Sequence, residues 1–226
     1  MNRTRASRPI PLALTALIAF FSALAALAVS NPHTAHAHGD DHQAKVTHQE
    51  LALRNDMRRL WEDHIVWTRL AIISLTTDAA DTDATVGRLL QNQADIGNAV
   101  KPFYGDAAGD KLTAELRKHI LIAAEVIAAA QAGDQAKLAD AQARWESNAD
   151  DIAALLASVN PRFWEEAVMK AEMHEHLRLT TDEVVARLQG DWNADVAAYD
   201  AVHRHILHMA DLVSTGLVKQ FPKRFR

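Results

Sequence analysis

Most of the chain consists of long stretches without glycine or proline, in which apolar residues recur with the period of an α-helix. In one stretch the spacing runs 4, 3, 4, 3, 4 through Leu53, Met57, Leu60, His64, Trp67 and Ala71. A second stretch has the same spacing through Leu112, Leu116, His119, Ala123, Val126 and Ala130. This spacing is typical of one buried face of a helix, so the sequence predicts an all-α protein.

Short breaks divide these stretches. Glycine, proline or aspartate at the breaks predicts about six helices, at 49–75, 83–100, 109–132, 135–158, 164–189 and 193–220. Short connections between long helices favour an antiparallel bundle. The chain has no cysteine, which excludes disulfides, zinc–thiolate sites and thiol nucleophiles.

Part of the sequence repeats. Glu115 precedes His119 by four residues, and Glu172 precedes His176 in the same way 57 residues later. The Gly-Asp pair at 133–134 recurs at 190–191, with the same offset. We therefore expect the bundle to contain a duplicated helical hairpin, with the first helix added in front.

The first 37 residues are typical of a secretory signal peptide. They contain three arginines and no acid, then the apolar run Ile10–Val29 and the small-residue sequence Ala35-His36-Ala37. The prediction is an exported protein, periplasmic or extracellular. The alternative is an uncleaved anchor in the inner membrane, because the run is just long enough to span a bilayer.

The segment 38–50 that would follow cleavage is rich in histidine, and we interpret it as a flexible leader. His38 and His42 could bind a transition metal, since imidazole suits copper, nickel and zinc. The alternative is a solvated leader with incidental histidines. We assign residues 51–222 to the bundle domain and 223–226 to a basic C-terminal tail.

Histidines inside apolar stripes are the main candidates for chemistry, because buried imidazoles need partners. The predicted metal ligands are His64, His119, His176 and His205, with Glu115 and Glu172 as ligands or as acceptors that orient the rings. On the last helix one apolar stripe includes His203, and a slightly rotated stripe includes His205 instead. A four-helix arrangement with one inward histidine per helix can build a metal site.

Copper, zinc and iron are the metals considered. The di-iron pattern asks for Glu-x-x-His, and no such motif in this sequence fits it, which disfavours oxygen-activating di-iron chemistry. The alternative is that each histidine forms ordinary hydrogen bonds in the core.

A second hypothesis is a pocket for a small ligand between the helices. Its candidate residues are Trp61, Arg69, Lys101 and Tyr104. Helix capping, turn chemistry and ordinary core packing would explain the same residues.

Charge and motifs argue against two other classes. The formal net charge is −5, and nucleic-acid binding needs a basic surface, so no nucleic-acid partner is expected. There is no Gly-rich phosphate loop, nucleophile elbow or His-Glu-x-x-His motif, so an enzyme is not indicated. The expected function is metal binding in a periplasmic bundle, with a small-ligand sensor or a structural interaction protein as alternatives.

Five stretches resemble a family of small exported or membrane-anchored bacterial all-helical proteins. They read WEDHIVWTRLAIISL, DIGNAVKPFYG, NADDIAALLASVNP, MHEHLRLT and VKQFP, and the resemblance spans Leu53 to Pro222. It implies an all-helical fold and no particular activity. It also implies that the following residues lie in recurring motifs: Trp61, His64, Thr68, Arg69, His119 and His176.

Overall fold

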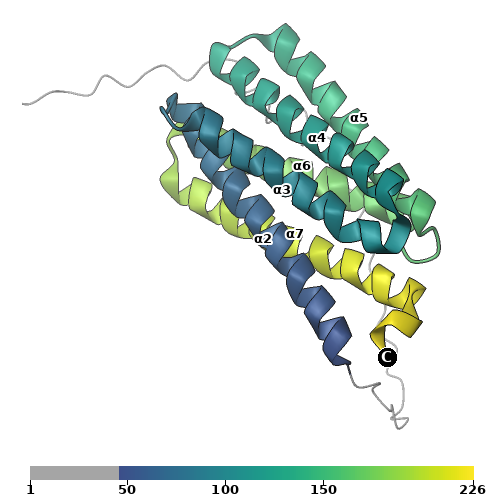
Figure 1. Cartoon of the computed structure of the whole chain (residues 1–226). Helices are drawn as coiled ribbons and strands as arrows, with labels where there is room; N and C mark the ends of the chain where they lie inside the picture. The colour runs from purple at the N-terminus through teal and green to yellow at the C-terminus, as the bar shows by residue number, and fades with distance from the viewer. Residues whose placement is uncertain (1–45) are drawn as a thin grey trace, which may run out of the picture.

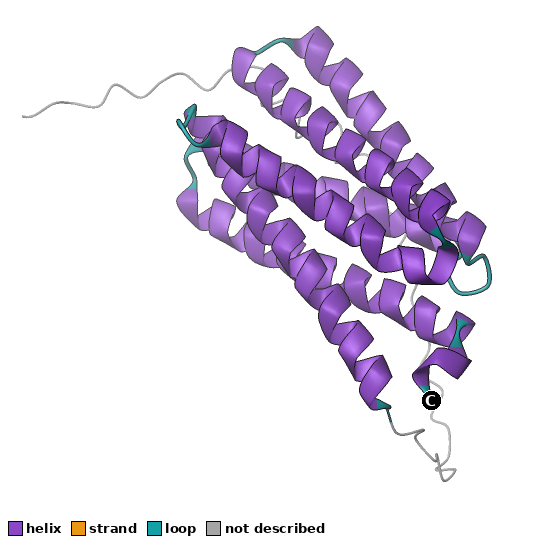
Figure 2. Ribbon diagram, in the orientation of Figure 1, coloured by secondary structure: helices purple, strands orange, loops and turns teal. Residues whose placement is uncertain are grey.

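The computed structural model describes residues 46–226, which form six α-helices and one short 3-10 helix, without a strand (Figure 2). The helices are α2 (His48–Thr77), α3 (Thr82–Tyr104), α4 (Asp106–Ala132), α5 (Gln135–Val159), α6 (Glu166–Gln189) and α7 (Trp192–Gln220), followed by η1 (Pro222–Phe225). The all-α prediction is confirmed. The predicted signal peptide and the residues His38 and His42 of the predicted leader lie outside the described residues.

Most helix ends fall within a few residues of their predicted positions. The largest difference is at α3, which we expected to end at Val100 and which continues through Pro102 to Tyr104. Pro102 lies in the last turn, so its missing N–H costs the helix one hydrogen bond, and few residues follow that a kink could disturb. The helix then ends at Gly105, whose positive φ of 82° favours glycine.

The two ends of the described chain meet. The Thr47 hydroxyl accepts from the Glu50 amide and so begins α2 inside the predicted leader. The same hydroxyl donates to the Phe225 carbonyl over 2.7 Å. Phe225 is buried and stacks on Phe103, with ring centroids 6.2 Å apart. The residues assigned to a basic tail therefore contribute to the core.

The six helices form a closed ring. Each helix packs against the next one in the chain, and α7 packs against α2 (Figure 1). Helix α2 also contacts α4 and α6, so the first helices of the hairpins α2–α3, α4–α5 and α6–α7 meet inside the ring.

Within residues 46–226, the duplicated hairpin has a third counterpart, formed by α2 and α3. His64 precedes His119 by 55 residues, and His119 precedes His176 by 57. The first helix of each hairpin ends at an equivalent left-handed residue, with φ of 50° at Asp78, 69° at Gly133 and 72° at Gly190. The repeat in the sequence did not reveal the first copy, because Asp78 occupies the position that Gly133 and Gly190 hold in the other two.

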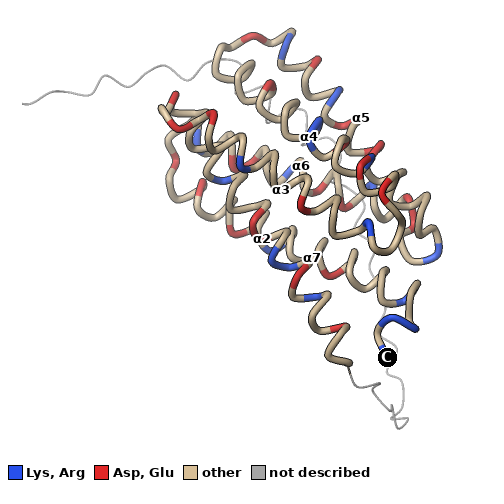
Figure 3. The backbone as a smooth tube through the Cα atoms, viewed as in Figure 1, with Lys and Arg blue, Asp and Glu red and all other residues tan. Residues whose placement is uncertain are grey.

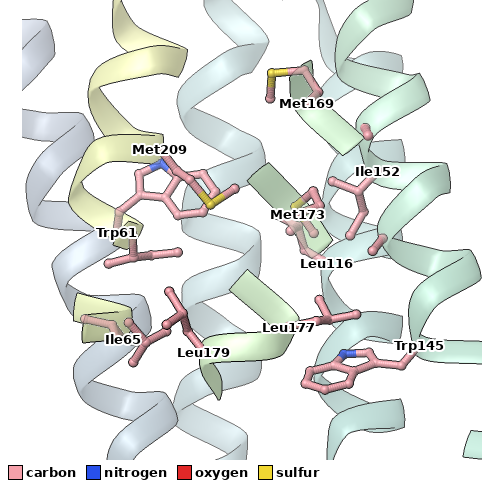
Figure 4. Close-up of a cluster of buried hydrophobic side chains, with 14 of the residues drawn as sticks. Trp61, Ile65, Leu116, Trp145, Ile152, Met169, Met173, Leu177, Leu179 and Met209 are labelled. Carbon is pink, nitrogen blue, oxygen red and sulfur yellow. The ribbon is translucent and has the colours of Figure 1, made fainter. Parts of the chain in front are cut away.

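Equivalent residues of α2, α4 and α6 occupy successive levels of the core. From the chain-terminal end inward, the levels are Met57, Leu112 and Met169; Trp61, Leu116 and Met173; His64, His119 and His176; Thr68, Ala123 and Thr180; and Ile72, Ile127 and Val184. The last three pack as one buried cluster. Figure 4 shows Trp61, Leu116 and Met173 among the buried apolar side chains of the core.

Candidate functional site

Three buried histidines meet at the middle level of the core. His64, His119 and His176 are each only 4% exposed. The ring centroid of His176 lies 5.8 Å from that of His64 and 6.1 Å from that of His119. On its other side, His176 stacks on His205, 6.3 Å away. Four predicted ligands are therefore neighbours, with His176 between the other three.

His119 is held in one orientation by a chain of hydrogen bonds. Asn148 Nδ2 donates to Glu115 Oε2 over 2.9 Å, which fixes the direction of the Asn148 amide. Asn148 Oδ1 must therefore accept from His119 Nδ1–H, at 2.9 Å. In the neutral ring this leaves a lone pair on Nε2, which is buried and has no hydrogen-bond partner.

His64 is held the opposite way. Gln93 Nε2 donates to the Leu89 carbonyl over 2.9 Å and lies 3.2 Å from His64 Nδ1, so Nδ1 accepts and Nε2 carries the proton. To serve as a ligand through Nε2, His64 would need the Gln93 amide to turn. Gln93 Oε1, itself buried and without a hydrogen-bond partner, would then accept Nδ1–H.

Burial keeps these rings neutral. Loss of solvation lowers the pKa of His64 to about 3 and that of His119 to about 4, with hydrogen bonds to Asn92 and Asn148 opposing the shift. Burial also lowers the pKa of His176 well below its usual value, and the neighbouring histidines add to the effect. His176 Nδ1 is the second ring nitrogen in the site that is buried without a partner. Neutral imidazole is the form that binds metals.

His205 connects the buried rings to the surface. Its Nε2–H donates to the Glu172 carbonyl over 3.0 Å, so Nδ1 is the free nitrogen of the neutral ring. Nδ1 lies 3.7 Å from Glu172 Oε2. His203, the alternative, faces elsewhere and pairs with Glu62 at 2.8 Å.

These side chains are close to one another, but their ring nitrogens and carboxylates do not converge on one point where an ion could bind. Across residues 46–226, no set of three or more His, Asp or Glu side chains is arranged to hold a metal ion. Imidazoles on one tetrahedral ion have ring centroids roughly 5 Å apart. The His176–His119 and His176–His64 pairs must each close by about 1 Å to reach that separation. The metal site therefore remains a prediction.

An apolar cavity of about 40 Å³ lies next to the histidine level. Its lining includes Thr68, Ala123 and Thr180, followed by Ile72, Ile127 and Val184. The hydroxyls of Thr68 and Thr180 donate to the carbonyls of His64 and His176, each over 2.8 Å. With these hydroxyls satisfied, the cavity is suited to apolar contents.

The residues proposed for a small-ligand pocket lie in separate places. Trp61 packs edge-on against His64, and the Arg69 guanidinium binds Glu183 and Asp195. Lys101 pairs with Asp110 at 2.6 Å, and the Tyr104 hydroxyl donates to Gln220. Of these four residues, Tyr104 alone lines any of the four cavities described among residues 46–226.

Gln93 and Asn148 are the site residues that sequence reasoning did not assign. Each lies 29 residues after the histidine that it contacts, and His205 lies 29 residues after His176. Glu115 contacts Asn148 and not His119, so it acts one bond further from the ring than expected. This equal spacing of 29 residues is the feature of the sequence that could have identified Gln93 and Asn148 as partners of the histidines.

In comparisons with known proteins, no protein-family model, no curated protein and no solved structure matches the chain. Among residues 46–226, no helix has the length and apolar character needed to cross a membrane. Figure 3 shows acidic and basic residues interspersed along the six helices.

Proposed function

We propose that this protein binds one transition-metal ion in the core of the bundle, with His119 and His176 as its first ligands. The observation that carries the proposal is that two neighbouring rings, with centroids 6.1 Å apart, each have a buried nitrogen without a partner, His119 Nε2 and His176 Nδ1. An unpaired buried polar atom costs about 1–3 kcal/mol, and a coordinated ion would remove both costs. His64 completes the ligand set if the Gln93 amide turns, and His205 is the alternative third ligand.

The surroundings of His119 support coordination. Metal-bound histidines usually donate their other N–H to a carboxylate or carbonyl, which fixes the ring and raises its basicity. The His119–Asn148–Glu115 chain supplies this contact. On the His205 side, Nε2–H donates to the Glu172 main-chain carbonyl, and the Glu172 carboxylate lies 3.7 Å from Nδ1. Together the two carboxylates balance the two charges that the ion brings into a neutral site.

The ligand type favours late first-row divalent ions. Neutral imidazole nitrogens suit Cu²⁺ and Zn²⁺, whereas hard ions prefer oxygen ligands. Iron is disfavoured because the inward carboxylates of a di-iron bundle are absent from the level of His64, His119 and His176.

The apolar cavity supports a second candidate function, the binding of a small apolar molecule beside the histidines. Its volume of about 40 Å³ admits a molecule of roughly two or three heavy atoms. Xenon NMR tests this candidate: Ile127→Trp should abolish a xenon shift that the unmodified protein shows. A shift that is unchanged in the variant would reject the cavity as the site.

Export forms part of the proposal, on the strength of the arginines and the apolar run before Ala37. N-terminal sequencing of the protein recovered from a periplasmic extract should give His38. An intact N-terminus in the membrane fraction would indicate an anchor instead.

The metal proposal is tested by calorimetric titration of the full chain with Cu²⁺ and Zn²⁺. We expect one tight ion per molecule, which is lost in His119→Gln and in His176→Gln. His174→Gln is the matched control, because His174 lies on the same helix with its side chain 39% exposed. A His38→Ala/His42→Ala variant separates binding by the leader. Tight binding that survives both core substitutions and disappears in the leader variant would reject the core site.

A further inference from the structure

A second group of histidine and carboxylate side chains lies where the histidine level reaches the surface, and like the core histidines these must move closer to share an ion. His208 is 62% exposed, while Glu172 and His205 are 21% and 11% exposed. Glu172 Oε1 lies 3.4 Å from His208 Nε2, and Glu172 Oε2 lies 3.7 Å from His205 Nδ1. One carboxylate therefore faces a nitrogen of each ring.

These separations are too long for strong hydrogen bonds but suit a shared ion. Charge-assisted N–H···O contacts are about 2.7–2.9 Å long. Two ligands at about 2.0–2.1 Å from one tetrahedral ion are roughly 3.4 Å apart. The His205 and His208 ring centroids are 6.5 Å apart, and the exposed His208 ring is free to turn toward the carboxylate.

The histidines also form a continuous path inward. Successive ring centroids are 6.5 Å apart from His208 to His205, 6.3 Å from His205 to His176, and 6.1 Å from His176 to His119. The other surface histidines of these two helices are engaged elsewhere, since His203 pairs with Glu62 and His174 with Asp150. Among the histidines of residues 46–226, His205 is the one whose ring neighbours both the exposed His208 and the buried His176.

We propose that Glu172, His205 and His208 form an outer site that captures a divalent transition-metal ion and passes it through His205 to the buried site. Transfer is an exchange of ligands: the ion replaces His208 with a nitrogen of His176, and then replaces Glu172 with His119 Nε2. Each step replaces one ligand with another, so the ion avoids the large cost of entering the interior without ligands. This inference rests on the proposed function for its destination but not for the outer site.

A residue that lies on the entry route but not in the final site affects the rates of binding and release by the same factor, so its loss leaves Kd unchanged. In stopped-flow absorption measurements with Co²⁺, His208→Ala should slow both rates by about tenfold or more, and the ratio that gives Kd should stay the same. His203→Ala, which removes a surface histidine from the same helix, should change neither rate. Wild-type rates in His208→Ala would overturn the transfer route.

The outer site is tested separately in a His119→Gln/His176→Gln background, which lacks both inner ligands. Copper EPR of this variant should show one weakly held Cu²⁺ with imidazole nitrogens, and Glu172→Gln should remove the signal. If no Cu²⁺ binds in this background, the outer site is rejected even when the core site binds. If Cu²⁺ binds there but the unmodified protein holds no second, tighter ion, the proposed function fails and the outer site stands.

Discussion

His119 Nδ1–H donates to Asn148 Oδ1 over 2.9 Å, and this contact determines which nitrogen of His119 is free. The amide cannot turn over, because its nitrogen is bound to the Glu115 carboxylate. A surface acid thus sets the tautomer of a buried ring through one intervening side chain.

Replacing Asn148 should therefore affect stability and binding together. In Asn148→Ala the buried Nδ1–H loses its partner, so the free energy of unfolding should fall by about 1–3 kcal/mol. Ion affinity should fall about 10- to 100-fold, as for other residues that orient a metal ligand. Urea denaturation and calorimetric titration measure the two effects. Asn98→Ala, on the exposed side of α3, is the control, and equal effects in both variants would contradict the assigned role.

The buried histidines should make the protein sensitive to acid. The pKa is about 3 for His64 and about 4 for His119, each lowered from 6.5, and that of His176 is also lowered. The unfolded chain takes up protons near pH 6.5 while the folded protein does not, so stability is full above that pH and is lost as the pH falls toward 4. Three such groups give a slope of up to about 4 kcal/mol per pH unit.

Urea midpoints measured from pH 7.5 to 4.5 test this prediction. His64→Leu should reduce the slope by about one proton, or roughly 1.4 kcal/mol per pH unit. A wild-type midpoint that does not change across this range would show that the rings are not held neutral.

Glu183 should have the opposite pH dependence. Burial raises its pKa from 4.5 to about 7, although Arg69 donates to its Oε1 over 2.7 Å. A raised pKa gives stability that is present below the unfolded pKa and lost as the pH rises through the folded one. From pH 5 to pH 8, Glu183→Gln should therefore gain roughly 1–3 kcal/mol relative to wild type. Exposed Glu166, near the start of the same helix, is the control, and a parallel pH curve for Glu183→Gln would contradict the prediction.

Two helical glycines should respond to alanine with opposite signs. A Cβ at Gly216 would lie 1.9 Å from Trp164 Nε1, inside a buried contact between α7 and the segment before α6. Gly216→Ala should destabilise by about 1–3 kcal/mol, because the indole cannot move without disturbing the core. A Cβ at Gly87 meets nothing within 4 Å, so Gly87→Ala should stabilise by about 0.5–1 kcal/mol. Thermal unfolding measures both, and equal signs would contradict the packing described for Trp164.

The end of α2 offers a test of the threefold repeat. Asp78 has a φ of 50°, where the equivalent positions hold Gly133 and Gly190. Asp78→Gly should stabilise by about 0.5 kcal/mol, since relief of strain slightly exceeds the entropy cost of glycine. Gly133→Ala should cost about 1–2 kcal/mol. Chemical denaturation of the two variants checks these values. A loss of stability in Asp78→Gly would contradict the prediction and show that the Asp78 side chain itself stabilises the end of α2.

The sequence predicted the elements well because helical periodicity is a local property. His64 and His119 stand in unbroken apolar stripes, and both are buried as expected. The choice between His203 and His205 was open, because the apolar residues of α7 form two slightly rotated stripes, one through each histidine. Packing against α6 decides it, by placing His205 beside His176.

The amides could not be predicted in the same way. Gln93 and Asn148 are polar residues on helices, which usually indicates a solvated face, yet both are fully buried. Their burial is tolerated because the partners come from a neighbouring helix about 30 residues away, and only the tertiary structure supplies them. Likewise, the first hairpin escaped notice because it lacks the Glu-x-x-x-His and Gly-Asp pairs that mark the other two.

The closed ring distinguishes this arrangement from repeat proteins that stack their units in a line. In a linear array the terminal units have one neighbour each, need caps, and can unravel while the rest remains folded. Here the contact between α7 and α2 gives every hairpin two neighbours, and each level of the core takes one residue from each hairpin. Opening any one hairpin would expose the histidine level to water, so the three copies should gain and lose their structure together.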